Sequence, residues 1–298
     1  MRESLLGFLK VNEVEYKESV SIREISPVKI GGTASIIIYP NNLKMLITVV
    51  NFLFENQIPY KIIGRISNIL FRDDIIETVL IKTDKLKNIE ISDEKAKFLC
   101  GDTIFENAVK LAKSGYSGIS ELSGIPGSIG GMMTNNAGAF GKSMSDIVNC
   151  AYVYFPKERK AEVLSKTEMM LGYRTSVFQS IESIVLQIEI NLHKAPVQEI
   201  LSEIYSIRST RAKTQPVGSP SLGSVFKKPA VGYAAKLIED AGLKGASIGD
   251  AQISKIHSGF IINKGSATSK DYRLLIEYVK SVIHREYGIT LEEEIEYL

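Results

Sequence analysis

The sequence predicts an α+β protein with two domains. Stretches whose apolar residues follow helical spacing alternate with short stretches rich in β-branched residues along most of the chain. Its 298 residues, 44% hydrophobic and 23% charged, have an ordinary globular composition and exceed the ~100–200 residues of a typical domain. A loop-rich segment at 214–232, TQPVGSPSLGSVFKKPAVG, interrupts the regular pattern. We therefore expect a second domain to begin in this region.

The first half of the chain predicts two helices with four strands between them. Apolar residues at 43–54 recur at helical spacing after Pro40-Asn41-Asn42, which is a helix start signal. A second helix is expected at 103–114, with Asp102 as its N-cap and Gly115 as its end. The strands between them are expected at 59–64, 77–83, 87–92 and 95–101.

The second half predicts further strands and three helices. Strands are expected at 146–155, 183–192 and within 252–263. Helices are expected at 197–212, at 233–241 before Gly242, and at 270–287 before Gly288. The last helix has a capping box formed by Thr268 and Asp271. Its predicted buried stripe consists of Leu275, Tyr278, Val279 and Val282.

Composition and charge argue against several functional classes. The net charge is only +2 and the basic residues are scattered, so we expect no nucleic-acid partner. No stretch approaches the ~18 apolar residues of a membrane helix, and charges interrupt the N-terminal apolar run, so we expect neither membrane span nor signal peptide. Cys100 and Cys150 are the only cysteines and suit a reducing cytoplasm. His193, His257 and His284 are isolated, so we expect no metal.

Residues 121–141, ELSGIPGSIGGMMTNNAGAFG, contain six glycines and no charge between Glu121 and the end of the stretch. The dinucleotide fingerprint GxGxxG does not fit at 124–131, and Asn136 replaces the first glycine of a P-loop pattern. Uncharged glycine-rich backbone can instead lay successive N–H groups along a diphosphate. The alternative is a tightly packed turn between strands.

Eight motifs occur in an order that points to a known family. They are KIGG at 29–32, Ser67-Asn68, SGIPGSIGG with NNAGAFG, YRTSVF at 173–178, SLGSVFKKP at 221–229, KLIEDAGLKG at 236–245, HSGFIIN at 257–263 and LEEEI at 291–295. This set resembles the UDP-N-acetylenolpyruvoylglucosamine reductase family, also called UDP-N-acetylmuramate dehydrogenase, over nearly the whole chain. The short span from YRTSVF to TQP resembles the family's shorter type, which lacks a tyrosine-bearing lid.

The resemblance implies a fold and an activity. The fold would be vanillyl-alcohol-oxidase-like (PCMH-type), with a FAD-binding domain at 1–196 made of lobes at roughly 1–58 and 59–196, and a substrate-binding domain at 197–298. The activity would be NADPH-dependent reduction of the enolpyruvyl ether of UDP-N-acetylglucosamine enolpyruvate to UDP-N-acetylmuramate for peptidoglycan synthesis. FAD would be noncovalent, the other partners would be these small molecules, and the protein would be a cytoplasmic monomer.

The resemblance also implies roles for individual residues. Ser224, otherwise an ordinary turn serine, would donate a proton to a substrate carbon. Arg174, otherwise the partner of a carboxylate, would bind the substrate carboxylate and stabilise the enolate. Glu294 would assist protonation, but strand alternation places Glu292 on the same side and leaves it as the alternative. The implied substrate-binding residues are Lys227, Lys228, Lys244 and His257.

The implied FAD-binding residues come from three places: the first flavin loop, GRISN at 64–68; the glycine-rich segment at 121–141; and the YRTSVF motif. They are Gly64, Ser67, Asn68, Gly124, Ile125, Pro126, Gly127, Ser128, Gly130, Gly131, Asn136, Ala137, Gly138 and Tyr173.

The first flavin loop departs from the family pattern because it reads GRISN, with Arg65 and Ile66 where small residues are usual. A β-branched residue at positive φ is strained. Either Ile66 keeps a negative φ, or the flavin site is altered. The alternative function is therefore a flavin-free paralogue that binds nucleotide sugars without this catalysis.

Overall fold

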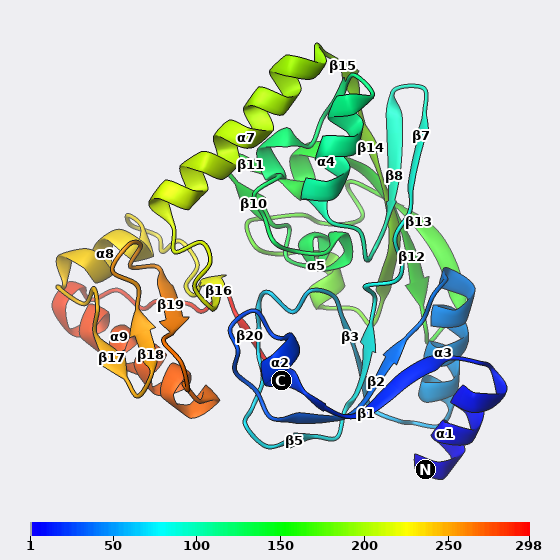
Figure 1. Ribbon diagram of the computed structural model, residues 1–298, viewed down its shortest axis with the longest axis horizontal. Coiled ribbons are helices and arrows are strands. Elements are labelled where there is room, and N and C mark those ends of the chain that lie inside the picture. The colour runs from blue at the N-terminus through cyan, green and yellow to red at the C-terminus, as the bar shows by residue number, and fades with distance from the viewer. Residues whose placement is uncertain (1) are drawn as a thin grey trace. The chain divides into compact units, whose positions relative to one another are not determined.

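The computed structural model describes residues 2–298, which form two compact units (Figure 1). Unit 1 contains the chain up to Glu18, Ile36–Arg65 and Thr78–Ser209. Unit 2 contains Ser19–Ser35, Ile66–Glu77 and Thr210–Leu298. The two units therefore alternate along the chain, and the passage from one to the other at Arg65/Ile66 lies inside the first flavin loop.

One sheet of unit 1 is antiparallel, in the order β13-β12-β14-β8-β7. Its strands are β7 (Ile89–Ser92), β8 (Lys95–Leu99), β12 (Val148–Phe155), β13 (Lys160–Ser165) and β14 (Ile184–Asn191). Ile188 of β14 pairs with Ala151 on one side and with Phe98 on the other, and all three are fully buried. They form one core with the apolar faces of α4 (Ile104–Lys113) and α5 (Ile129–Thr134).

A second layer of unit 1 is built on parallel strands. Strand β6 (Val79–Lys82) pairs with both β2 (Thr33–Tyr39) and β3 (Tyr60–Ile63). Helix α3 (Leu43–Glu55) packs on these strands together with α1 (Arg2–Val11). The carbonyl oxygen of the Asn42 side chain accepts a hydrogen bond from Met45 N at 2.8 Å and so caps α3.

Unit 2 is organised around the antiparallel sheet β16-β19-β18-β17. Its strands are β16 (Ser221–Ser224), β17 (Ser247–Ile248), β18 (Ala251–Ile253) and β19 (Phe260–Asn263). Helices α8 (Ala234–Asp240) and α9 (Ser269–Tyr287) share a core with this sheet, and Tyr272 of α9 is fully buried there. α9 begins with the predicted capping box and ends at Gly288, whose φ of +66° is left-handed.

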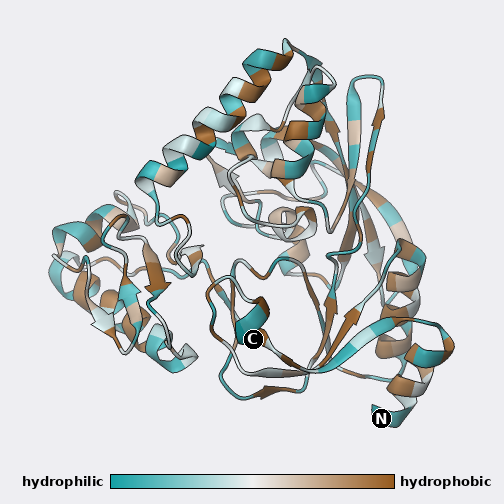
Figure 2. Ribbon diagram, in the orientation of Figure 1, coloured by the Kyte–Doolittle hydropathy of each residue, from teal (hydrophilic) through white to brown (hydrophobic). Residues whose placement is uncertain are grey.

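The remaining elements are short, apart from α7. They are β1 (Glu15–Ser21), α2 (Ile22–Ile25), β4 (Ile69–Leu70), β5 (Ile75–Ile76), β9 (Tyr116–Ser117), η1 (Ser120–Leu122), β10 (Gly138–Ala139), β11 (Lys142–Ser143), α6 (Met144–Ile147), η2 (Val177–Gln179), β15 (His193–Lys194), α7 (Val197–Thr214) and β20 (Glu296–Tyr297). Hydrophobic and hydrophilic residues alternate along α4 and α7 (Figure 2), as expected for helices with one buried side.

Most predicted helices and strands are present near their expected bounds, with two corrections at the residue level. Asp102 is not an N-cap: α4 has Thr103 at that position, and the Asp102 carboxylate instead accepts hydrogen bonds from the backbone N–H groups of Asn88 and Leu99. Burial raises the pKa of this carboxyl group. Tyr278 is 47% exposed, so it does not belong to the buried stripe of α9, which includes Ile276 instead.

Two further observations concern membranes and metals. Among the helices of residues 2–298, none combines the length and apolar character that a membrane span requires. In the same part of the chain, His, Cys, Asp and Glu side chains do not gather in threes to form a metal-binding group. Cys100 is buried and Cys150 partly buried, and both are free thiols.

Candidate active site

Within unit 1, the first flavin loop touches the glycine-rich segment at Gly64 and Ser128. An ideal Cβ on Gly64 would lie 1.9 Å from Ser128 Oγ and 2.9 Å from Ser128 Cβ, so a side chain at position 64 would push the two segments apart. Ser128 is only 3% exposed. The two segments expected to bind the flavin are therefore neighbours, and glycine is needed at 64 for this close approach.

The glycine-rich segment is partly a packed turn and partly a short helix. Ile129 N donates to Asp102 O and Gly130 N donates to Cys100 O, each at 2.9 Å, so both groups are used within the protein. A Cβ on Gly130 would lie 3.2 Å from Cys100 Cβ. The packed-turn explanation therefore accounts for Gly130, and α5 begins directly behind Ser128.

The same segment retains a buried polar group that suits a ligand. Ser123 is 1% exposed, and its Oγ has no hydrogen-bond partner within residues 2–298. Buried hydroxyl groups are normally hydrogen-bonded, and Ser123 Oγ is one of five buried side-chain atoms of residues 2–298 that have no partner. Neutral N–H and hydroxyl donors on a charge-free segment can bind the diphosphate of FAD. The residues present therefore fit this cofactor.

Asn136 links the glycine-rich segment to the YRTSVF turn. It is 4% exposed and has a φ of +39°, which asparagine tolerates better than most residues. Its side-chain Nδ2 donates to Gly172 O at 2.7 Å, and its Oδ1 accepts from Ser145 N at 2.9 Å. The side chain thus supports neighbouring backbone.

Arg174 lies in the turn that the Asn136 side chain supports through Gly172 O. Gly172 and Thr175 exchange two backbone hydrogen bonds of 3.0 and 3.2 Å, and the tight turn places Arg174 at a φ of +54°. Its Nη2 donates to Gly138 O at 3.2 Å, and its guanidinium lies 5.0 Å from the centre of the Tyr173 ring. The structure therefore brings Arg174 to the second half of the glycine-rich segment.

Within unit 2, Ser224 and Glu294 lie on neighbouring stretches of backbone. Ser224 ends β16 and pairs with Phe260 of β19. The next residue, Val225, accepts a hydrogen bond from Glu294 N at 2.8 Å and donates one to Gly259 O at 2.9 Å. Hydrogen-bonded backbone on both sides holds the exposed Ser224 in place.

Asn68 is bound to the same C-terminal segment. Its Nδ2 donates to Glu294 O at 2.9 Å, and its backbone O accepts from Glu296 N at 2.9 Å. The adjoining strands β4 and β20 are parallel partners. Asn68, predicted from the first flavin loop, thus fixes the backbone that carries Glu294.

The three consecutive glutamates have distinct surroundings. Glu293 accepts from Lys280 Nζ at 2.9 Å and from the Tyr297 hydroxyl, which ties it to α9. Glu292 forms an exposed ion pair with Lys227, with a distance of 3.5 Å. Glu294 is partly buried beside the Ser224 strand, whereas Glu292 is exposed.

The predicted substrate-binding residues also belong to unit 2. Lys244 Nζ lies 2.7 Å from Glu239 Oε1. The His257 ring stands edge-on to Phe260, with centroids 5.0 Å apart, and its Nδ1 accepts from Gly259 N at 3.2 Å. Burial, and next the charge of Lys244, lower the pKa of His257. Its contacts with Gly259 and Phe260 connect His257 to β19, the strand that pairs with Ser224.

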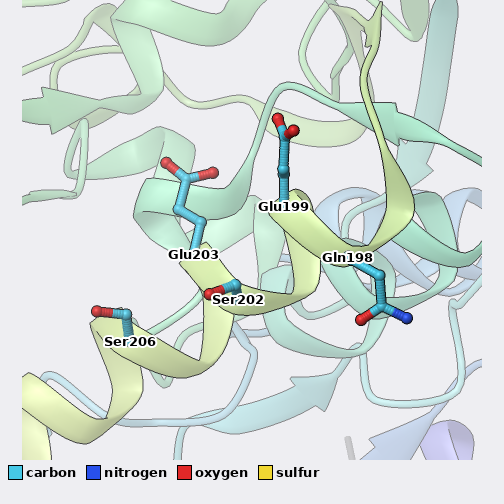
Figure 3. Close-up of a pocket in the computed structure, with 5 residues that line it drawn as sticks. All are labelled: Gln198, Glu199, Ser202, Glu203 and Ser206. Carbon is cyan, nitrogen blue, oxygen red and sulfur yellow. The ribbon is translucent and has the colours of Figure 1, made fainter.

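Lys228 lies beside an exposed aromatic ring. Its Nζ is 4.8 Å from the centre of the Tyr233 ring, and Tyr233 is 64% exposed. A pocket along α7 contains none of the predicted site residues (Figure 3); it is lined by Gln198, Glu199, Ser202, Glu203 and Ser206.

Ile66 does not keep a negative φ. Its φ is +47° and its side chain is 3% exposed, so a buried β-branched residue occupies the strained left-handed region. The first of the two alternatives, a negative φ at Ile66, is therefore excluded. Sequence reasoning also missed Lys82, whose buried ammonium group donates to Gly64 O at 3.0 Å. A lysine at the end of an apolar strand, VLIK, was the only signal for it.

Comparisons with known proteins agree with this geometry. Residues 34–158 match a family model described as FAD binding domain, and residues 215–298 match the C-terminal domain of UDP-N-acetylenolpyruvoylglucosamine reductase. A reductase of that name from Clostridium botulinum is 40% identical over 90% of this chain and 87% of its own length. The one from Halalkalibacterium halodurans is 37% identical over 98% and 96%, respectively.

Solved structures agree as well. The UDP-N-acetylenolpyruvylglucosamine reductase of Thermus caldophilus superposes with a TM-score of 0.80 and 29% identity, covering 95% of this chain and 98% of that one. Glucooligosaccharide oxidase from Acremonium strictum superposes with a TM-score of 0.51 at 14% identity, covering 97% of this chain and 60% of that one, and shows the fold alone.

The fold and the matched domains define an FAD-dependent oxidoreductase built on the vanillyl-alcohol-oxidase-like FAD-binding fold. The chain belongs to the UDP-N-acetylenolpyruvoylglucosamine reductase family. The flavin-free alternative has no support from these matches.

Proposed function

We propose that this chain reduces the enolpyruvyl ether of UDP-N-acetylglucosamine enolpyruvate to UDP-N-acetylmuramate in peptidoglycan precursor synthesis, with NADPH as electron donor. Relatives named for this reduction match nearly the whole chain. The structural observation that carries the proposal is the hydrogen bond from Glu294 N to Val225 O, which sets Glu294 beside the strand of Ser224. Bound FAD supplies hydride transfer from NADPH to one carbon of the enolpyruvyl double bond.

Side chains of the protein supply the proton and stabilise the negative charge that develops on the substrate. Ser224 donates a proton to the carbon next to the one that receives hydride, as a general acid worth ~10²–10⁴ in rate. Arg174 binds the substrate carboxylate, where a fixed cation stabilises the negative charge that develops. Glu294 orients the enol and assists protonation. Two hydrogen bonds support these roles: Asn68 Nδ2 donates to Glu294 O, and Arg174 Nη2 donates to Gly138 O.

Four residues of unit 2 bind the nucleotide-sugar substrate in this proposal. Lys244 and His257 bind its diphosphate, and the pKa of His257 is lowered by burial, so its ring is neutral over more of the pH range. A neutral ring still donates one hydrogen bond to an anion. Lys227 and Lys228 complete the set.

The cofactor and domain assignments are part of the same proposal. FAD is bound noncovalently by residues of 1–196, through the first flavin loop, the glycine-rich segment and Tyr173. Residues 197–298 bind the substrate. The protein works as a monomer in the cytoplasm, where NADPH and nucleotide sugars are available.

Replacing Ser224 by Ala separates the two half-reactions. In stopped flow without oxygen, NADPH should reduce the flavin of Ser224→Ala at the wild-type rate, because no substrate proton is needed in that step. Reoxidation by the enolpyruvyl nucleotide should slow by ~10²–10⁴. Ser221→Ala, three residues earlier on β16, is the matched control and should leave both rates unchanged. Equal slowing of both half-reactions in Ser224→Ala would contradict the assigned role.

A further inference from the structure

Lys82 is a buried cation at the end of β6. Its side chain is 9% exposed, whereas Lys85 nearby, which is paired with Glu15, remains 41% exposed. Burying an ammonium group is unfavourable unless its donors are satisfied by charged or polar partners. Lys82 has two: the Asp84 carboxylate and the backbone oxygen of Gly64. Lys82 thus donates a charged hydrogen bond to the carbonyl of the peptide group that joins Gly64 to Arg65.

This peptide group starts the first flavin loop. Lys82 Nζ donates to Gly64 O at 3.0 Å, and Thr83 N donates to the preceding carbonyl, Ile63 O, also at 3.0 Å. In a trans peptide the carbonyl of one residue and the N–H of the next point in opposite directions. Holding Gly64 O towards Lys82 therefore fixes the N–H of Arg65 on the opposite side, away from β6.

The same loop carries backbone strain. Ile66 has a φ of +47°, and a β-branched residue keeps such a conformation only when its surroundings impose it. Gly64 is also confined by Ser128, which leaves no space for a Cβ. The charged hydrogen bond from Lys82 is stronger than a neutral one and acts two residues before the strained position.

We propose that Lys82 is a positioning residue for FAD, which orients the first flavin loop through Gly64 O so that its N–H groups can bind the cofactor. The inference rests on the proposed flavin site. It concerns the loop backbone, and Lys82 itself need not touch FAD. The competing explanation is a structural ion pair, in which only the attraction between Lys82 and Asp84 matters.

The test is FAD affinity of the apo-protein, measured by fluorescence titration. Lys82→Met should weaken FAD binding by about 10- to 100-fold, the range for losing one hydrogen bond to a charged group. Lys85→Met, which removes an exposed lysine from the same unit, should bind like wild type. Asp84→Asn replaces the carboxylate by a neutral acceptor and keeps the bond to Gly64 O, so it should lose much less FAD affinity than Lys82→Met.

Hydrogen exchange of the apo-protein gives a readout without cofactor. Amides of residues 64–68 should exchange faster in Lys82→Met than in Lys85→Met. If Lys82→Met does not fold, Lys82→Gln, a shorter neutral donor, serves in both measurements. Wild-type affinity in Lys82→Met, or equal loss in Asp84→Asn, would overturn the inference. A wild-type protein that fails to bind FAD would instead refute the proposed function.

Discussion

Gly64 has no room for a side chain, because an ideal Cβ would lie 1.9 Å from Ser128 Oγ. The contact joins a loop and a segment that are 64 positions apart in the sequence. Asn136 plays a comparable part at the other end of the segment, where its amide supports the turn of Arg174. Single residues of the flavin motifs therefore hold backbone segments together.

Gly64→Ala should reveal this contact. The added methyl group must displace Ser128, and such overpacking typically destabilises by about 1–3 kcal/mol and disturbs the two segments. We expect weaker FAD binding in a fluorescence titration of the apo-protein and a lower free energy of unfolding in urea.

The double variant Gly64→Ala/Ser128→Gly should recover part of both losses, because it removes the Oγ and Cβ atoms that the methyl group meets. Gly7→Ala is the matched control, since no atom lies within 4 Å of its ideal Cβ. Unchanged FAD affinity in Gly64→Ala would show that the two segments do not need this spacing.

The motifs nominate candidate reactive residues but not the residues that hold them in place. Ser224, Arg174 and Glu294 stand in short strings of characteristic residues, so the letters alone nominate them, and their roles stay predictions. Lys82 could not be found in this way, because its partner Gly64 is 18 positions distant and its side chain is aimed by the pairing of β3 with β6. The positive φ of Ile66 is likewise not signalled by the sequence, because β-branched residues rarely adopt it.

At the scale of elements, helices with local end signals were predicted best. α3 and α9 carry their caps in the sequence, at Asn42 and at Thr268 with Asp271. The prediction of Asp102 as an N-cap was wrong because its carboxylate accepts a hydrogen bond from the backbone N–H of Asn88, 14 residues earlier. The sequence did not predict α5, because two glycines near its start have a low helix propensity. Tertiary packing of its apolar residues stabilises this short helix.

The capping box of α9 gives a prediction at this scale. Thr268→Ala removes the hydroxyl that accepts from Asp271 N at 3.0 Å and should lower the free energy of unfolding by about 1 kcal/mol. Urea unfolding followed by circular dichroism measures the change. Thr214→Ala, at the end of α7 and outside any N-cap, should have a smaller effect. An equal loss in both variants would show that the capping box contributes nothing specific.

At the scale of the whole molecule, the α+β class followed from the alternating helical and strand patterns, and the FAD-binding fold followed from the resemblance that the order of motifs carries. The interleaving of the two compact units did not, because segments 19–35 and 66–77 join residues 210–298 through packing that no local pattern encodes. Val28, Ile30 and Leu70 share the core of α9, far from it in sequence.

The central claim is that the whole chain is a flavoenzyme that passes electrons from NADPH to an enolpyruvyl nucleotide. An anaerobic visible absorbance spectrum of the purified protein, recorded before NADPH, after NADPH and after the nucleotide, tests it most directly. We predict a flavin spectrum that NADPH bleaches and that UDP-N-acetylglucosamine enolpyruvate restores. A colourless protein that added FAD does not turn yellow, or a bleached flavin that the nucleotide leaves unchanged, would contradict the account.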